Sequence, residues 1–261
     1  MQIVKIFFSN LKLSLLKDLS YKANFLMRFL SDSIFILVYY LFYSVIYSYV
    51  SNINDWNKYE VILLMGTFHI IISIFLSLFF PNLIQIPRLI KEGRLDDYLL
   101  KPVNTQFIVS TKIIDIGSFG NIVLGAALVI NSLHELGLKP DLYSFLFYII
   151  YIILGVLIMY SILFILLSSA FWLQDSSWSI GFFMTFNSFG DKPINMYKGV
   201  LYRFLIYLFP IGLVANIPSN KILGKTDSTL EYWIILVTIV LLSITNYIWK
   251  KGLKLYEGAS S

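Results

Sequence analysis

Long uninterrupted apolar runs constrain this chain more than any other feature of its sequence. The runs at 29–50, 59–80 and 142–171 each reach the ~20 residues that an α-helix needs to cross the hydrocarbon core of a bilayer. Hydrophobic residue types make up 58% of the 261 residues, and charged types only 13%. The sequence therefore predicts an all-α polytopic membrane protein, with little chain left over for a soluble domain.

Six transmembrane helices are predicted when the weaker apolar runs are added to these three. The third span contains Gly117, Gly120 and Gly125, which we expect to let neighbouring helices approach closely. Residues 29–261 are thus interpreted as one transmembrane domain. The predicted spans are about 29–50, 59–80, 107–131, 142–171, 173–190 and 231–249.

The fifth crossing has two candidates, because both 178–190 and 200–217 are apolar. The second candidate carries Arg203 and is interrupted by prolines, which favours a re-entrant path covered by protein or water. We therefore assign the crossing to 173–190 and predict that 191–230 forms an outer re-entrant segment before the last helix.

An amphipathic helix is predicted at the N-terminus, over residues 1–28. Lys5 and Lys12 fall on one helical face, whereas Phe8 and Leu11 fall on the opposite face. This pattern is typical of a helix that lies in the membrane interface with its lysines toward anionic headgroups.

The distribution of Lys and Arg predicts the orientation in the bilayer. Five of them lie in the N-terminal segment, four in the stretch 81–102 and three after the last span. The two short loops on the opposite side carry one each, Lys58 and Lys139. Because positive charge is enriched on the cytoplasmic side, both termini and the stretch 81–102 are expected in the cytoplasm.

The stretch 81–102 is the longest polar break in the first half of the chain, with four basic and three acidic residues. Its apolar residues recur at roughly helical spacing, which predicts a short amphipathic helix that Gly93 interrupts. Two interpretations follow from the residues alone. The stretch either connects two spans as a solvated loop or offers a surface to a soluble partner.

Several kinds of site are excluded by residue type. The chain has no cysteine and only two histidines, which rules out thiolate and histidine-rich metal centres. Residues 219–226 resemble a phosphate-binding loop, but they do not follow a buried strand and too little chain remains to build a nucleotide-binding domain. The net charge of +5 is explained by membrane topology, so no nucleic-acid partner is expected. His69 lies inside the second span and is a candidate pathway residue.

The string from Ile90 to Pro102, IKEGRLDDYLLKP, resembles the I-x-x-G-x-L-D-x-x-L-L-[KR]-P string of the membrane-spanning permease subunit of bacterial type-2 ATP-binding-cassette (ABC) exporters. The similarity is to an uncharacterised branch of that family. The Phe171-Trp172 pair and the spacing of three prolines resemble the same branch, and the resemblance covers essentially the whole chain.

The resemblance implies a half-transporter of the bacterial plasma membrane rather than an enzyme. A second permease, identical or a paralogue, would complete the pathway, and two copies of a cytoplasmic ABC ATPase would bind the ATP and Mg that this chain does not bind. The stretch 81–106 would then be the cytoplasmic coupling loop, with its coupling helix. The implied ATPase-coupling residues are Arg88, Lys91, Glu92, Gly93, Arg94, Leu95, Asp96, Asp97, Tyr98, Leu100, Lys101 and Pro102.

Export of an amphipathic or hydrophobic substrate (drug, peptide or lipid) is the expected function. The alternative is an ATP-independent channel or secondary carrier, which would need charges lining a path through the membrane. The candidate pathway or gate residues are His69, Pro193, Arg203, Pro210 and Pro218.

Overall fold

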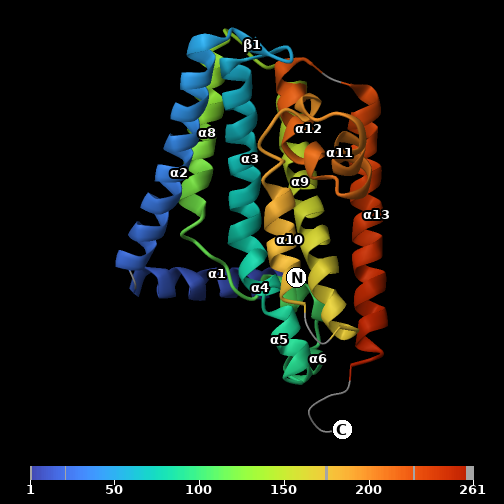
Figure 1. The fold of residues 1–261 in the computed structure, drawn as a ribbon. Coiled ribbons are helices and arrows are strands. Elements are labelled where there is room, and N and C mark those ends of the chain that lie inside the picture. Colours follow the sequence, from blue (N-terminus) through green and yellow to red (C-terminus); the bar gives the residue numbers. More distant parts are fainter. Residues whose placement is uncertain (1, 21, 174–175, 226, 257–261) are drawn as a thin grey trace.

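Long apolar helices standing side by side make up most of the chain in a computed structural model, which describes residues 2–20, 22–173, 176–225 and 227–256 (Figure 1). Within these ranges the side chains of residues 2–6, 17–26, 28–29 and 32 are not described. Three helices in the described part of the chain are long and apolar enough to cross a membrane: Lys58–Leu78, Leu142–Phe171 and Ser228–Leu253. The fold is therefore the helical membrane bundle that the apolar runs predict.

The first two helices meet at the lower end of the bundle. In Figure 1, α1 (Gln2–Ser20) lies across that end, whereas α2 (Lys22–Tyr49) rises along the other helices. The side chain of Phe8 in α1 is 61% exposed, and Asn10 donates a hydrogen bond of 3.4 Å to the carbonyl of Thr111. An exposed apolar face on a helix held across the bundle end fits the predicted interface helix.

A short β-hairpin with a two-residue turn connects α2 to the next helix at the upper end. Strands β1 (Asn52–Ile53) and β2 (Trp56–Asn57) pair antiparallel, and α3 (Lys58–Leu78) follows directly. The turn residues Asn54 and Asp55 have φ values of +46° and +64°. Asn and Asp tolerate this left-handed region better than other non-glycine residues, which explains their use in a tight hairpin.

Close backbone contact joins α3 to α8 (Phe119–Glu135). A Cβ atom added at Gly66 would lie 2.8 Å from the carbonyl oxygen of Gly125, and one added at Gly125 would lie equally close to the oxygen of Gly66. Only glycine fits on either side, as in other membrane helix pairs packed through small residues. The prediction of close packing is confirmed for Gly125.

We expect Gly125→Ala to destabilise the bundle by roughly 1–3 kcal/mol, because the new methyl group meets backbone atoms that cannot rotate away. Its neighbours would be the oxygen of Gly66 at 2.8 Å and the nitrogen of Ile70 at 3.1 Å. Denaturant titration of the purified protein in detergent measures this loss. Gly181→Ala is the matched control, because it adds the same group to a helix where no atom lies within 4 Å. Equal stability of the two variants would contradict the prediction.

The second half of the bundle is built around α9 (Leu142–Ser168), which continues into η1 (Ser169–Phe171). It packs against both α12 (Ile211–Leu223) and α13 (Ser228–Leu253). A Cβ added at Gly155 of α9 would lie 3.0 Å from a backbone oxygen of α12, so these two helices also touch closely. The structure has one helical segment, apolar and long enough to cross a membrane, over the thirty residues 142–171 at which the sequence predicts a span.

The predicted span over 107–131 differs from the structure, in which α7 (Thr105–Thr111) and α8 are separate helices. The side-chain amide of Asn82 makes hydrogen bonds of 2.7 Å with both the N–H and the carbonyl of Ile113. A distant side chain thus satisfies backbone groups that a continuous helix would pair internally.

The predicted crossing over 173–190 also differs from the structure. Helix α10 (Trp178–Asn187) has ten residues, or ~15 Å, about half of a hydrocarbon core. Figure 1 shows α10 in the lower half of the bundle and α12 in the upper half. Neither segment crosses alone, and together they extend from end to end.

A sharp bend lies within 191–230, the predicted outer re-entrant segment. It contains η2 (Ile194–Met196), α11 (Gly199–Arg203) and the π-helical turn η3 (Phe204–Leu208). The axis of α11 and η3 meets that of α12 at 85°, so this pair is either a re-entrant loop or one broken span. The bend fits the re-entrant path expected of the first part of the segment, whereas α12 joins the bundle.

The two ends of the bundle separate the connecting segments. The lower end in Figure 1 carries α1, the end of α13 and two helices of the stretch 81–102, α5 (Ile86–Lys91) and α6 (Asp96–Leu99). The upper end carries the β-hairpin. The N-terminal helix, the charged stretch and the end of the last helix therefore share one side, as the sequence predicts.

Candidate functional site

Three short helices form the charged loop, the name used here for residues 81–102, together with the preceding Phe80. They are α4 (Phe80–Leu83), α5 (Ile86–Lys91) and α6 (Asp96–Leu99). Gly93 separates the last two with a φ of +68°, a left-handed conformation that favours glycine. The predicted interruption at Gly93 is confirmed, and it turns α6 back toward the bundle.

The inner face of the charged loop is fixed to the bundle by polar and apolar contacts. The backbone N–H of Leu95 donates to the hydroxyl of Tyr256, beyond α13, at 3.1 Å. The ammonium of Lys112 donates to the hydroxyl of Tyr98 at 3.1 Å and lies 4.9 Å from the centre of its ring. Side chains that are fully buried on this face are those of Leu83, Ile86 and Leu95.

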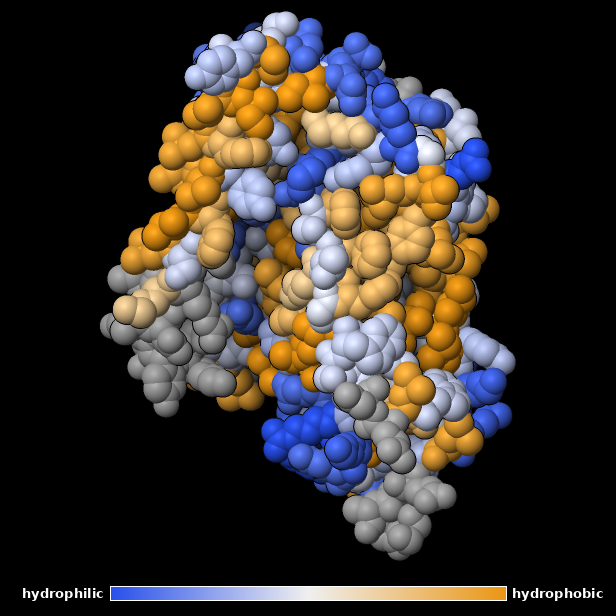
Figure 2. Space-filling view, viewed as in Figure 1, coloured by the Kyte–Doolittle hydropathy of each residue, from blue (hydrophilic) through white to orange (hydrophobic). Residues whose placement is uncertain are grey.

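The outer face of the charged loop is exposed and carries both signs of charge. Glu92 accepts from Arg88 at 2.7 Å and pairs with Arg94 at 3.5 Å. The hydrogen bond from Arg88 lowers the pKa of the Glu92 carboxyl below its usual value. Leu100 is 87% exposed, and Figure 2 shows hydrophilic residues gathered at this lower end beneath an apolar belt. The other exposed residues of the charged loop are Ile84, Lys91, Asp97, Leu99, Lys101 and Pro102.

Predicted coupling residues therefore fall into two groups. Leu95 and Tyr98 are buried within this chain, so they position the loop and leave contact with another protein to their exposed neighbours. Leu99 and Leu100 belong to the apolar residues that recur at roughly helical spacing, and the structure exposes both. They follow the turn at Gly93, where the helical register ends.

A seam between α2 and α3 contains two cavities, one above the other. The lower cavity, of about 400 Å³, lies between the start of α2, the end of α3 and the segment 115–118. It is lined by polar groups, among them Ser31, Asp115 and Ser118, together with apolar residues. Leu76 lines this cavity and also the next, so the two are neighbours along the seam.

The upper cavity, of about 280 Å³, lies in the middle of the bundle between α2, α3, α8 and the segment after α10. His69 lines it, which places this predicted pathway residue beside a cavity at membrane depth. Its other lining residues are Phe35, Ile36, Tyr39, Phe68, Ile72, Ser73, Leu76, Asn121, Ser188 and Asp191.

The other four predicted gate residues lie elsewhere. Pro193 precedes η2, the exposed Arg203 ends α11, Pro210 stands at the 85° bend, and Pro218 is inside α12. None of them is among the residues lining the two seam cavities. The structure thus brings His69 to the seam and assigns the four others to the bent segment.

Sequence reasoning missed the residues that fold the segment after α10. Asp191 is 8% exposed and accepts from Lys192 at 2.7 Å. The buried amide of Asn216 accepts from the N–H of Ile194 at 2.9 Å and donates to the carbonyl of Lys192 at 3.1 Å. Asp191 could have been singled out from the sequence, because a charged Asp-Lys pair directly follows an apolar run. The sequence has no comparable feature at Asn216.

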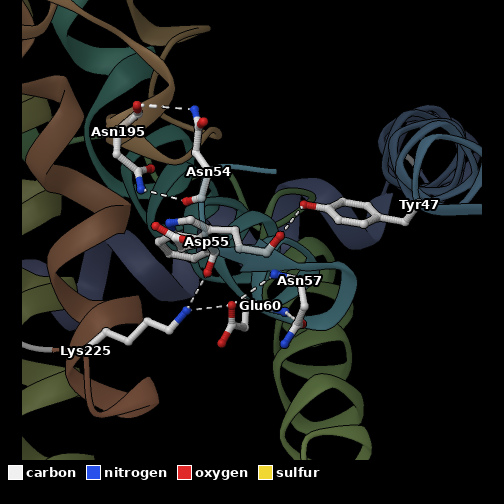
Figure 3. A network of polar contacts seen from close by, with 8 residues as sticks. Tyr47, Asn54, Asp55, Asn57, Glu60, Asn195 and Lys225 are labelled. Atoms are coloured by element: carbon white, nitrogen blue, oxygen red, sulfur yellow. Dashed lines mark hydrogen bonds and ion pairs between the residues drawn. The ribbon is translucent and has the colours of Figure 1, made fainter. Parts of the chain in front are cut away.

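A polar network closes the upper end of the bundle (Figure 3). The ammonium of Lys225, after α12, contacts the carboxylate of Glu60 at 2.7 Å and the carbonyl of Asp55 at 2.9 Å. The side chain of Asn195 donates to the carbonyl of Asn54 at 3.0 Å, and that of Asn54 donates back at 3.4 Å. The hairpin is thereby tied to both α12 and η2.

A second ion pair lies deeper at the same end. Lys221 of α12 contacts Glu231 of α13 at 3.0 Å, with side-chain exposures of 10% and 17%. The hydroxyl of Tyr151 in α9 donates to the same carboxylate at 3.1 Å, and Lys221 lies over the rings of Tyr143 and Phe147. Three helices therefore meet at this pair. The described residues include no group of three or more His, Cys, Asp or Glu that could hold a metal ion.

Apolar helices of bilayer length, with polar groups along an internal seam, define a polytopic membrane protein. The chain belongs to the ABC-2 family of transporter proteins, whose sequence pattern, described as "ABC-2 family transporter protein", matches residues 33–260. No curated protein and no solved structure matches it significantly.

Family membership makes the chain a permease subunit of an ABC transporter and confirms the resemblance carried by the string from Ile90 to Pro102. The family's members are transport subunits that work with an ABC ATPase. The match begins after α1, so the interface helix lies outside the shared pattern.

Proposed function

We propose that this chain forms half of the translocation pathway of an ABC exporter and couples it to a separate cytoplasmic ATPase. The seam between α2 and α3 is the part of the pathway that this chain contributes. Two cavities in succession along that seam, each with polar groups among largely apolar residues, support this assignment, since polar groups at membrane depth are costly unless they serve a function. The substrate is amphipathic or hydrophobic (a drug, peptide or lipid), in keeping with the largely apolar walls.

The charged loop carries this proposal, because it is anchored on one face and exposed on the other. ATP-driven closure of two ATPase subunits would draw the exposed residues inward. The contacts from Leu95 to Tyr256 and from Tyr98 to Lys112 would pass that movement to the helices. Because both contacts attach the loop to the bundle, a movement of its exposed residues would be transmitted to the helices.

Orientation and span number complete the proposal. Six crossings are obtained if α2, α3, α8, α9 and α13 each cross and α10 with α12 makes the other. The excess of Lys and Arg at the lower end supports a cytoplasmic location for both termini and the charged loop of a bacterial plasma-membrane protein.

The number of subunits in the proposed complex is inferred from the single seam of this chain. One chain offers one wall of a pathway, so a second permease, identical or a paralogue, would supply the opposite wall. Each permease would dock on one ATPase, giving two ATPase copies per complex. ATP and Mg would be held by the ATPases, with no cofactor on this chain.

Site-specific cross-linking tests the coupling. Because the chain has no cysteine, Arg94→Cys introduces a single thiol on the exposed face of the charged loop. We expect a thiol-attached photo-cross-linker at this position to capture a co-expressed ATPase encoded beside this chain. The measurement is a shifted band that contains both proteins.

Glu135→Cys is the matched control, since Glu135 is exposed at the opposite end of the bundle and should capture no ATPase. Equal capture at both positions, or none at Arg94 with an ATPase that never copurifies, would refute the coupling. Substrate movement by this chain alone in ATP-free proteoliposomes would instead support a channel or secondary carrier.

A further inference from the structure

Aromatic rings form much of the wall of the upper seam cavity. Phe35 and Tyr39 approach it from α2, and Phe68 and His69 from α3. The rings of Phe68 and His69 are arranged edge to face, with centroids 6.4 Å apart. Phe35 is 64% exposed and Tyr39 is 38% exposed, so the wall on the α2 side is open to an entering molecule.

The same cavity contains a carboxylate, with His69 as the one basic residue type among its described lining residues. Asp191 lines it, and the described lining residues include no Lys or Arg. Lys192 holds Asp191 through its Oδ1 oxygen at 2.7 Å and also donates to the carbonyl of Ser188. The Lys192 side chain is 35% exposed and does not line the cavity, so Asp191 is the acidic residue beside the aromatic rings among the described lining residues.

We propose that this cavity binds the cationic head of an organic ammonium ion. The faces of aromatic rings attract cations, and the attraction grows when water is excluded, as it is at membrane depth. A nearby carboxylate adds charge complementarity in the same low-dielectric surroundings. This inference rests on the proposed export function and deepens it, because it makes cationic amphiphiles the preferred substrate class.

The size of the cavity limits what it holds. Its volume of about 280 Å³ is just below the ~300–1,000 Å³ typical of ligand pockets. It therefore takes an ammonium head with one ring or a few carbons, while an attached apolar tail extends along the seam toward the lower cavity.

A protection experiment tests the cavity directly. Ser188→Cys places the only thiol of the chain on the cavity lining, at an exposed position. The rate at which methyl methanethiosulfonate, a small neutral reagent, modifies this thiol is measured with rising phenyltrimethylammonium. Benzenesulfonate has the same ring with an anionic tetrahedral head, so it serves as the opposite-charge probe. We expect the cation to protect the thiol and the anion not to.

Two substitutions, each in the Ser188→Cys background, test the two interactions separately. Asp191→Asn removes the charge, and Tyr39→Leu removes one ring; each should raise the half-protecting cation concentration about tenfold. Glu135→Gln removes an exposed carboxylate far from the cavity and should change nothing. Tyr39 is partly exposed, so its variant remains informative if Asp191→Asn, checked by gel filtration, fails to fold.

Equal protection by the two ions, or cation protection unchanged in a folded Asp191→Asn or Tyr39→Leu variant, overturns the inference. Nanodiscs with and without phosphatidylethanolamine distinguish the sources of the ammonium group. Protection by this lipid alone would support ammonium recognition and make the lipid the occupant. If the cation does not protect the thiol but cross-linking at Arg94 is retained, this inference fails and the proposed coupling stands. If that cross-linking is lost while cation protection is retained, only the export proposal fails.

Discussion

Replacing Glu231 by Gln is expected to lower the free energy of unfolding by about 3–5 kcal/mol, the usual cost of leaving one partner of a buried ion pair without its counter-charge. The Lys221 side chain is only 10% exposed, and the substitution removes the carboxylate that lies 3.0 Å from its ammonium. The hydroxyl of Tyr151 can still donate to the new amide oxygen, so the loss reports the charge. Denaturant titration in detergent gives the magnitude.

An exposed pair provides the control for this prediction. Arg88 and Glu92 are only 2.7 Å apart, but their side chains are 71% and 39% exposed. Water screens such pairs, so Glu92→Gln should cost less than ~1 kcal/mol. Combining Lys221→Met with Glu231→Leu should restore most of the stability, because apolar side chains avoid the desolvation cost. A loss at Glu231 no larger than at Glu92 would contradict the interpretation.

Sequence reasoning succeeded where structure depends on local hydropathy and length. The runs 59–80 and 231–249 correspond to α3 and α13 within a few residues, and 142–171 corresponds to α9 with η1. An apolar run of about 20 residues must be helical in a bilayer, because no water satisfies its backbone. Such helices are therefore predictable without knowledge of their neighbours.

The predicted spans that differ from the structure are those whose backbone groups form hydrogen bonds with side chains distant in sequence. Asn82 pairs with Ile113 across 31 positions and interrupts a run that is apolar enough to continue as a helix. Asn216 likewise pairs with Ile194 across 22 positions and fixes the loop that follows the half-length helix α10. An asparagine in an apolar run indicates a polar contact, but the sequence does not say with which segment.

The candidate sites divide in the same way. His69 was recognisable as an ionisable group within a span, and the charged loop as a polar break with a specific string. The cavity around His69 was not, because its wall combines α2, α3, α8 and Asp191, which only the tertiary packing brings together. A single sequence therefore identifies the groups that are costly to bury but not the cavity they share.

Replacing Gly93 by Val is expected to reduce coupling to the ATPase at least tenfold while the bundle stays folded. A β-branched residue does not adopt the φ of +68° found there without strain of more than ~1–2 kcal/mol. The turn between α5 and α6 would relax and carry Leu95 and Tyr98 out of their buried positions. The exposed residues would then lose their alignment, whereas the packing of α9 against α12 and α13 does not involve this turn.

Gly137→Val separates strain from coupling. Gly137 has nearly the same φ, +66°, with no atom within 4 Å of an added Cβ, and it lies in the connection between α8 and α9 at the opposite end of the bundle. Both variants carry nearly the same backbone strain, and Gly93→Val additionally loses the burial of Leu95 and Tyr98, so its unfolding midpoint should fall by at least as much. Copurification of the ATPase, and its stimulation by this chain, should fall only for Gly93→Val. If both variants lose the ATPase equally, the loss follows from destabilisation and the charged loop has no special part in coupling. If neither does, the loop is the solvated connector that its composition alone allows.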